Sequence, residues 1–234
     1  MENLQNTDEH VLKTRPDDFL SSTVHRRSFL KYAGAGAAGV ALVAAGCRKD
    51  NNFEGVYFGS DDIAILNYAY ALEQLEAAFY IQVVASPYTN ISSTELSYLT
   101  DVRDHEIAHR EFFKAALAGN AITALEVDFS TINFSSRDSV LATAEAFEDL
   151  GVSAYNGAGF LIKSPAYLTL AGKIVSVEAR HAALIRDLIS NGTFADSTVI
   201  NSQGLDTSRS PTQVLAIAST YIKTKLNVSD LPTY

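Results

Sequence analysis

The sequence predicts an all-α protein: a four-helix bundle with a long crossover between the second and third helices and an additional C-terminal helix. Three observations support this fold class. Apolar residues recur at helical spacing in four segments of roughly 25 residues each. Residues 120–135, between the second and third of these segments, have no helical period. Each of the four segments also carries a glutamate near its middle, a position that a bundle brings to one level.

The composition is typical of a folded, acidic protein. The chain has 234 residues, of which 47% are hydrophobic, and this is enough for one sizeable core. A net charge of −9 argues against nucleic acid as a partner, because phosphate binding needs clustered Lys and Arg, whereas it suits the attraction of metal cations. Cys47 is the only cysteine, so a metal site in this chain must use oxygen and nitrogen donors.

Residues 1–47 are interpreted as a twin-arginine export signal with a lipobox, separate from the folded part. Arg26 and Arg27, followed by a weakly hydrophobic run, are similar to the export pattern. Residues 44–47, Ala-Ala-Gly-Cys, resemble a lipobox in which Cys47 would be lipidated. A transmembrane anchor is the alternative, but roughly fifteen apolar residues are short for a bilayer that needs about twenty. We therefore expect an exported periplasmic or envelope protein, held at the membrane by a lipid on Cys47.

The first half of the folded part is predicted to contain two helices. Residues 48–60 show no periodicity and are expected to form a flexible tether. The first helix is predicted over 61–84, with Pro87 closing it. The second opens at residues 92–95, Ser-Ser-Thr-Glu, which have the character of a capping box. It runs to Gly119, a natural residue for the position after a helix.

The second half begins with the crossover. Apolar and polar residues alternate over 120–135, which predicts an extended segment along the bundle and implies that the second and third helices run parallel. The third helix is predicted over 137–157. Ser164 and Pro165 begin the fourth, as N-cap and first helical residue, and Asn191-Gly192 ends it.

A C-terminal helix completes the prediction. A polar loop over 193–210 precedes it, Ser210-Pro211 opens it, and it ends near Leu226. Its apolar face indicates packing on the bundle. The bundle itself is therefore assigned to 61–192, and 193–234 to the loop and this packed helix.

Two copies of Glu-x-x-His are the main candidates for chemistry. Glu106-Ile-Ala-His109 lies in the second helix, and Glu178-Ala-Arg-His181 lies in the fourth. Residues three apart share a helix face, so each copy presents a carboxylate and an imidazole to one point. Both copies lie on the apolar stripe of their helix and should point inward. A divalent cation is one of few partners that can neutralise several buried carboxylates.

Glu73 and Glu148 are the corresponding glutamates of the first and third helices. All four glutamates lie about twelve residues into their helices, roughly 18 Å from the start, so four carboxylates and two imidazoles can converge. Glu73 is followed seven residues later by Tyr80, and Glu148 is followed seven residues later by Tyr155. The order Glu-x6-Tyr and then Glu-x-x-His therefore occurs twice, which indicates an internal duplication.

These features resemble the ferritin-like superfamily, in particular exported bacterial ferritin-like domain proteins. The resemblance is carried by residues 66–80, Leu-Asn-Tyr-Ala-Tyr-Ala-Leu-Glu-Gln-Leu-Glu-Ala-Ala-Phe-Tyr, and by 148–155, Glu-Asp-Leu-Gly-Val-Ser-Ala-Tyr. It covers 61 to about 190 and implies a dinuclear site. Oxygen-rich ligation with two imidazoles suits two iron or manganese ions, with iron favoured, better than zinc or copper.

The resemblance also implies a role for each residue. Two glutamates would be terminal ligands, two would bridge the metals, each metal would have one imidazole, and two tyrosines would donate hydrogen bonds to ligands. The terminal ligands would be Glu73 and Glu148, and the bridging ligands would be Glu106 and Glu178. The imidazoles would be those of His109 and His181, and the hydrogen-bond donors would be Tyr80 and Tyr155.

Alternatives remain open for several of these residues. Glu76 and Glu145 lie three residues from the proposed terminal ligands and could replace them, although the shared tyrosine spacing favours the pair given above. The two tyrosines could also be core aromatics whose hydroxyls are satisfied elsewhere. His105 lies on a different side of the helix from Glu106 and His109. It is expected at the surface or in contact with a ligand, not as a ligand itself. Lys173 and Arg180 are expected on a solvated face.

Three functions are compatible with such a centre. The favoured one is oxidative chemistry with O2 or peroxide, ferroxidase-like or peroxidase-like, in an envelope-anchored protein. The second is a non-catalytic role as a stress-related or desiccation-related structural protein of the same fold. Iron storage in a closed shell is the least favoured, because a lipid anchor on every subunit is awkward for a cage. A homo-oligomer is compatible with all three.

Overall fold

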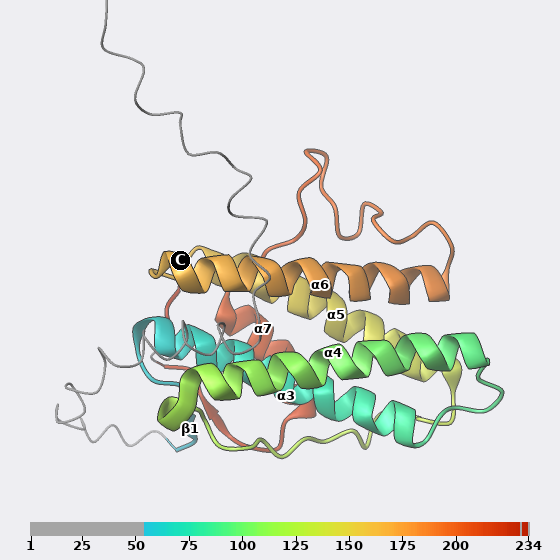
Figure 1. The fold of residues 1–234 in the computed structure, drawn as a ribbon, viewed down its shortest axis with the longest axis horizontal. Coiled ribbons are helices and arrows are strands. Elements are labelled where there is room, and N and C mark those ends of the chain that lie inside the picture. Colours follow the sequence, from blue (N-terminus) through green and yellow to red (C-terminus); the bar gives the residue numbers. More distant parts are fainter. Residues whose placement is uncertain (1–53, 230, 234) are drawn as a thin grey trace, which may run out of the picture. The chain divides into compact units, whose positions relative to one another are not determined.

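The structure, a computed structural model, describes residues 54–229 and 231–233. The twin-arginine pair, Cys47 and the first part of the expected tether lie outside these residues. The described part is mainly helical, which confirms the all-α prediction (Figure 1). None of its helices has the length and apolar content of a membrane span. Its helices are α3 (Asp61–Ala85), α4 (Ser93–Leu117), α5 (Arg137–Gly159), α6 (Pro165–Ile189) and the shorter α7 (Pro211–Ala218).

The four long helices pack as two pairs. Helix α3 packs against α4, α5 packs against α6, and α3 also contacts α5. Figure 1 shows the segment between α4 and α5 returning along the bundle, so that α4 and α5 run in the same direction. This is the parallel arrangement that the extended crossover predicts.

Serine side chains mark the beginnings of the helices. The predicted caps, Ser92, Ser164 and Ser210, each accept a hydrogen bond from a backbone N–H three residues further on. Pro165 occupies the first turn of α6, where its missing N–H costs nothing. Ser210 and Gln213 complete a reciprocal capping box at α7. These local signals predicted the helix starts because they depend only on neighbouring residues.

Gly119 takes the predicted position after the C-cap of α4, but the positive φ typical of a glycine there lies one residue earlier. Ala118, the C-cap, has a positive φ of 48°, and Gly119 lies in the short 3₁₀ turn η1 (Ala118–Asn120). The buried Asn67 of α3 explains the shift, because its amide nitrogen donates to the Asn120 carbonyl at 2.8 Å and its amide oxygen accepts from the Ile122 N–H at 2.9 Å. A tertiary contact therefore decides where the chain turns.

Helix α3 lies at the centre of the bundle. Seventeen of its 25 residues are buried, so it is covered on nearly all sides. The ring of Phe79 on this helix is the centre of an aromatic cluster. The centroids of four other rings lie 5.0 to 6.0 Å from it, those of Tyr80, Phe129, Phe134 and Phe147. Two of these rings come from the crossover, which therefore forms part of the core.

The C-terminal helix is shorter than expected. It ends at Ala218, is followed by the 3₁₀ turn η2 (Ser219–Tyr221), and does not reach Leu226. After the turn the chain pairs with the crossover, because the Asp128 N–H donates to the Tyr221 carbonyl and the Lys223 N–H donates to the Glu126 carbonyl, both at 2.8 Å. These backbone hydrogen bonds require an extended chain and end the helix.

The expected tether is also partly ordered. Strand β1 (Val56–Tyr57) pairs in parallel with strand β2 (Leu226–Asn227), and Phe58 is only 2% exposed within the core. The expectation of an unstructured segment over 48–60 is therefore wrong for these residues. The pairing joins positions about 170 residues apart in sequence, which periodicity cannot reveal.

Candidate metal centre

One glutamate from each long helix points into the middle of the bundle. Glu73 of α3, Glu106 of α4, Glu148 of α5 and Glu178 of α6 all have 0% exposure. Each lies near the middle of its helix, and the packing of the helices brings these levels together. The structure thus brings together the four glutamates that the sequence singled out.

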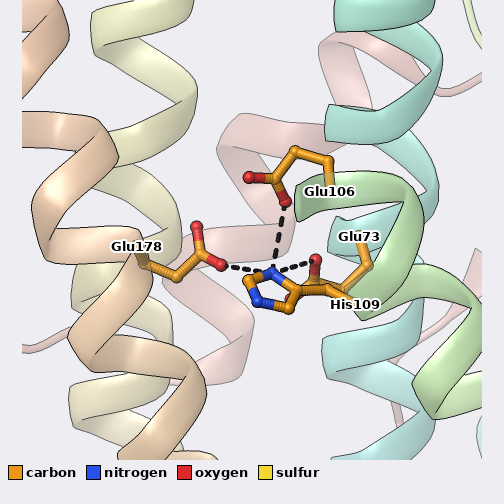
Figure 2. Close-up of side chains that lie close together, drawn as sticks. All are labelled: Glu73, Glu106, His109 and Glu178. Carbon is orange, nitrogen blue, oxygen red and sulfur yellow. Dashed lines mark ion pairs between the residues drawn. The ribbon is translucent and has the colours of Figure 1, made fainter. Parts of the chain in front are cut away.

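The first group of ligand candidates surrounds His109. Its Nδ1 lies 2.8 Å from Glu178 Oε1, 3.5 Å from Glu73 Oε2 and 3.6 Å from Glu106 Oε2. Figure 2 shows the carboxylates of Glu73, Glu106 and Glu178 pointing toward this imidazole from different sides. One donor atom from each of the four residues lies within 4.8 Å of the others, an arrangement that could hold one metal ion.

The second group surrounds His181 and repeats the first. Its Nδ1 lies 2.8 Å from Glu106 Oε1, 3.5 Å from Glu148 Oε2 and 3.7 Å from Glu178 Oε2. Donor atoms of these four residues also lie within 4.8 Å of one another. Glu106 and Glu178 belong to both groups, and each turns one oxygen toward each imidazole. The two groups of candidate ligands therefore lie side by side and share two carboxylates.

The two tyrosines connect the halves of the site crosswise. Tyr80 of α3 donates a hydrogen bond of 2.6 Å to Glu148 Oε1 of α5, and Tyr155 of α5 donates to Glu73 Oε1 of α3. Both hydroxyls are therefore donors to the candidate ligands, and the alternative that they are satisfied elsewhere is excluded. Each bond occupies Oε1 and leaves Oε2 of the same carboxylate directed at the centre.

The remaining ligand atoms have no hydrogen-bond partner outside the cluster and contact only one another. Eight buried side-chain atoms are in this state, and they are the same atoms that approach the two imidazoles. They are Oε2 of Glu73 and Glu148, both oxygens of Glu106 and Glu178, and Nδ1 of His109 and His181. Buried polar atoms are normally satisfied. Four carboxylates and two imidazole nitrogens in this arrangement could hold metal ions.

Protonation is strongly perturbed at the glutamates that belong to only one group. Burial, together with repulsion from Glu178, raises the pKa of Glu73 well above its ordinary value. Burial likewise raises the pKa of Glu148 to about 8, although contact with His181 acts in the opposite direction. Without a metal, burial therefore favours the protonated form of both carboxyl groups, and Glu148 holds its proton at neutral pH.

The pKa of Glu106, one of the two shared glutamates, is lowered, whereas the pKa values of the two imidazoles are raised. Burial alone would raise the pKa of Glu106, but contacts with His109 and His181 outweigh it and hold the pKa at about 2. Burial alone would lower the pKa of His181, but contacts with Glu106, Glu148 and Glu178 raise it to about 12. The pKa of His109 is raised for the same reason. Protons thus balance the buried negative charge wherever a metal does not.

A fifth carboxyl group lies beside the cluster. Glu76 is 4% exposed, and burial followed by repulsion from Glu178 and Glu106 raises its pKa well above its ordinary value. Gly151 of α5 makes room for it, because a Cβ at that position would lie 3.0 Å from Glu76 Oε1. Gly151 follows Glu148 by three residues, as Glu76 follows Glu73, so the two halves of the site differ here.

The other residues considered from sequence lie outside the cluster. The carboxylate of Glu145 lies 3.5 Å from Arg186 and is partly exposed, so Glu145 does not replace Glu148. Lys173 and Arg180 are exposed, as expected for a solvated face. His105 is exposed as well, but its Nδ1 contacts Nε2 of His181 at 2.9 Å.

Comparison with known families agrees with this geometry. Residues 61–191 match the family model described as a ferritin-like domain, which is more than half of the chain. Residues 23–43 match the model of a TAT (twin-arginine translocation) pathway signal sequence, which confirms the export signal around Arg26 and Arg27. Comparison with curated proteins gave no match.

Proposed function

This chain belongs to the ferritin-like domain family, and from that premise we propose that its bundle holds a dinuclear iron or manganese centre, with iron favoured. We further propose that the centre performs oxidative chemistry with O2 or peroxide outside the cytoplasmic membrane. The observation that carries the proposal is the set of eight buried ligand atoms that have no partner outside the cluster and face one another at short distances. Only cations or protons can balance them at this depth.

Each residue of the cluster has a defined part in this proposal. Glu106 and Glu178 would each contribute one oxygen to each of the two metals, because each directs one oxygen at His109 and the other at His181. Glu73 and His109 would complete one position, and Glu148 and His181 would complete the other. Tyr80 and Tyr155 hold Oε1 of the terminal glutamates, so that only Oε2 is available to a metal.

The donor types favour iron or manganese. Carboxylate oxygens dominate both positions, with one imidazole nitrogen each and no thiolate, and this is unlike the sulfur-rich or nitrogen-rich sites of structural zinc and copper. Bound iron or manganese would supply a change between divalent and trivalent states and an open coordination position for an oxidant. The four glutamates have 0% exposure, so bulk water does not reach their carboxylates directly.

Metal analysis of the purified protein tests the ligand set. The unmodified protein should bind two Fe(II) or Mn(II) ions per chain, and His181→Ala should bind one. Glu145→Ala is the matched control, because Glu145 lies on the same helix as Glu148 but contacts Arg186 and not the cluster. Two metals at full occupancy in His181→Ala would contradict the assignment, and so would the loss of a metal in Glu145→Ala.

A second experiment separates turnover from metal binding alone. Added Fe(II) should be oxidised in air, or peroxide decomposed, faster with the purified protein than with free metal. If neither rate exceeds that of the free metal, the protein holds its metals without turnover, as a structural protein of the same fold would. Light scattering on the same sample decides whether the chains form a closed shell.

We also propose that the mature protein is attached to the envelope through a lipid on Cys47. The proposal is based on residues 44–47, Ala-Ala-Gly-Cys, which follow the twin-arginine signal. The mass of the mature N-terminus should show an acylated cysteine, and Cys47→Ala should release the protein from the membrane fraction. An unmodified N-terminus at another residue would contradict the anchor.

A further inference from the structure

One of the two candidate imidazoles has an imidazole neighbour. His105 Nδ1 lies 2.9 Å from His181 Nε2, the ring planes differ by 10°, and the centroids are 5.1 Å apart. The faces of two rings in contact stay about 3.5 Å or more apart. Nitrogen atoms at 2.9 Å therefore mean that the rings meet edge to edge in nearly one plane, the geometry of an N–H···N hydrogen bond.

The chemistry of the site gives this hydrogen bond a direction. His181 turns Nδ1 toward the three carboxylates, and a nitrogen that binds a metal must offer a lone pair. The ring proton of a neutral, metal-binding His181 is then on Nε2, from which it donates to Nδ1 of His105. His105 accepts this bond and carries its own ring proton on the exposed side.

The other half of the site has no equivalent. His105 directly precedes Glu106 in the first motif, and the residue that directly precedes Glu178 in the second motif is Val177. A valine side chain can neither accept nor donate a hydrogen bond. Among the residues that the structure describes, His105 and His181 are the one imidazole pair in hydrogen-bond contact.

We propose that His105 is a positioning residue: it holds His181 in the tautomer that presents Nδ1 to the metal, and it makes the position served by His181 the tighter of the two. The proposal is based on the dinuclear centre proposed above. A partner that fixes the outer nitrogen of a ligand imidazole typically changes metal affinity by about 10-fold to 100-fold. The metal ion beside His181 should therefore bind first, before the one beside His109.

A titration of the full-length purified protein with Co(II) tests the proposal. The unmodified protein should show two binding events of different affinity, by calorimetry and by the visible absorption of Co(II). His105→Leu should weaken the tighter event by about 10-fold to 100-fold and leave the weaker one unchanged. Ala108→Leu is the control, because Ala108 is also exposed on α4 and the change should leave both events in place.

Two further measurements separate positioning from a general structural effect. His105→Asn keeps an acceptor close to the place of Nδ1 and should restore most of the lost affinity. In protein loaded with Zn(II), nitrogen NMR of the His181 ring should show metal on Nδ1 and a proton on Nε2. That proton should exchange with water faster in His105→Leu.

Specific results would overturn the proposal. Unchanged affinity for both metals in His105→Leu, or a His181 ring with its proton on Nδ1, would exclude the positioning role and leave the dinuclear centre intact. Loss of both binding events in His105→Leu together with His105→Asn would also exclude it, because a restored acceptor should rescue the site. Absence of Co(II) binding by the unmodified protein would instead overturn the dinuclear centre itself.

Discussion

Raising the pH should destabilise the metal-free protein and stabilise the metal-loaded one. Burial raises the pKa of Glu148 to about 8, against the opposing contact with His181, from an ordinary value of 4.5. Between these two values the folded protein keeps a proton that the unfolded chain has released. The free energy of unfolding must then fall as pH rises. One retained proton corresponds to about 1.4 kcal/mol per pH unit, or about 3 kcal/mol between pH 5 and pH 7.

The other shifted groups do not reverse this sign. Glu73 and Glu76 also have raised pKa values, so they add to the loss of stability in the same range. His181, whose pKa is raised to about 12, keeps its proton in the folded state and contributes stability that is lost as pH rises above its ordinary value of 6.5. The pKa of Glu106 is about 2, so its opposite effect is confined to pH values below 4.5.

Bound metal should invert the dependence. Metal ions displace the protons of the carboxyl groups and of Nδ1, so binding strengthens as pH rises and the folded state gains stability with it. Urea unfolding followed by circular dichroism at pH 5, 6 and 7, with chelator or with Mn(II), measures both slopes. A metal-free protein whose stability is constant or increases over this range would refute the account of the cluster.

Three substitutions test the surroundings of the site. Tyr155→Phe removes the hydrogen bond to Glu73 and should weaken the metal position beside it by about 10-fold or more, measured by calorimetric titration of metal. Gly151→Ala should stabilise the helix by about 1 kcal/mol only when Glu76 is also changed to Ala, because the added Cβ would lie 3.0 Å from Glu76 Oε1. A double-mutant cycle measured by urea unfolding should therefore show coupling between the two changes, and additive effects would contradict the contact. Phe79→Ala removes the central ring of the aromatic cluster and should cost about 3–5 kcal/mol in the same unfolding assay, whereas a loss below about 1 kcal/mol would show that the cluster is loosely packed.

Local features of the fold could be predicted from sequence. Ser92, Ser164 and Ser210 mark helix starts because a cap needs only the next three residues. The lack of helical period over 120–135 likewise predicted the crossover and the parallel direction of α4 and α5. The positive φ of Ala118 and the course of the chain after Ala218 could not be predicted in this way, because contacts with groups distant in sequence determine them.

The sequence alone determined which residues can form the candidate site. Spacing of three on a helix pairs Glu106 with His109 and Glu178 with His181, and mid-helix position places the other glutamates at the same level. Those are one-dimensional properties of regular helices, and the structure brings the six residues together as the spacing predicts. Their role as metal ligands stays a prediction for metal analysis.

The tertiary structure alone decided how these residues face one another. Tyr80 and Tyr155 bond across the bundle to the glutamate of the opposite half, Gly151 opens space for Glu76, and the exposed His105 meets His181 edge to edge. Each of these contacts depends on the rotation of one helix about its axis relative to another. That rotation is set by the packing of the whole core, and no spacing within a single helix encodes it.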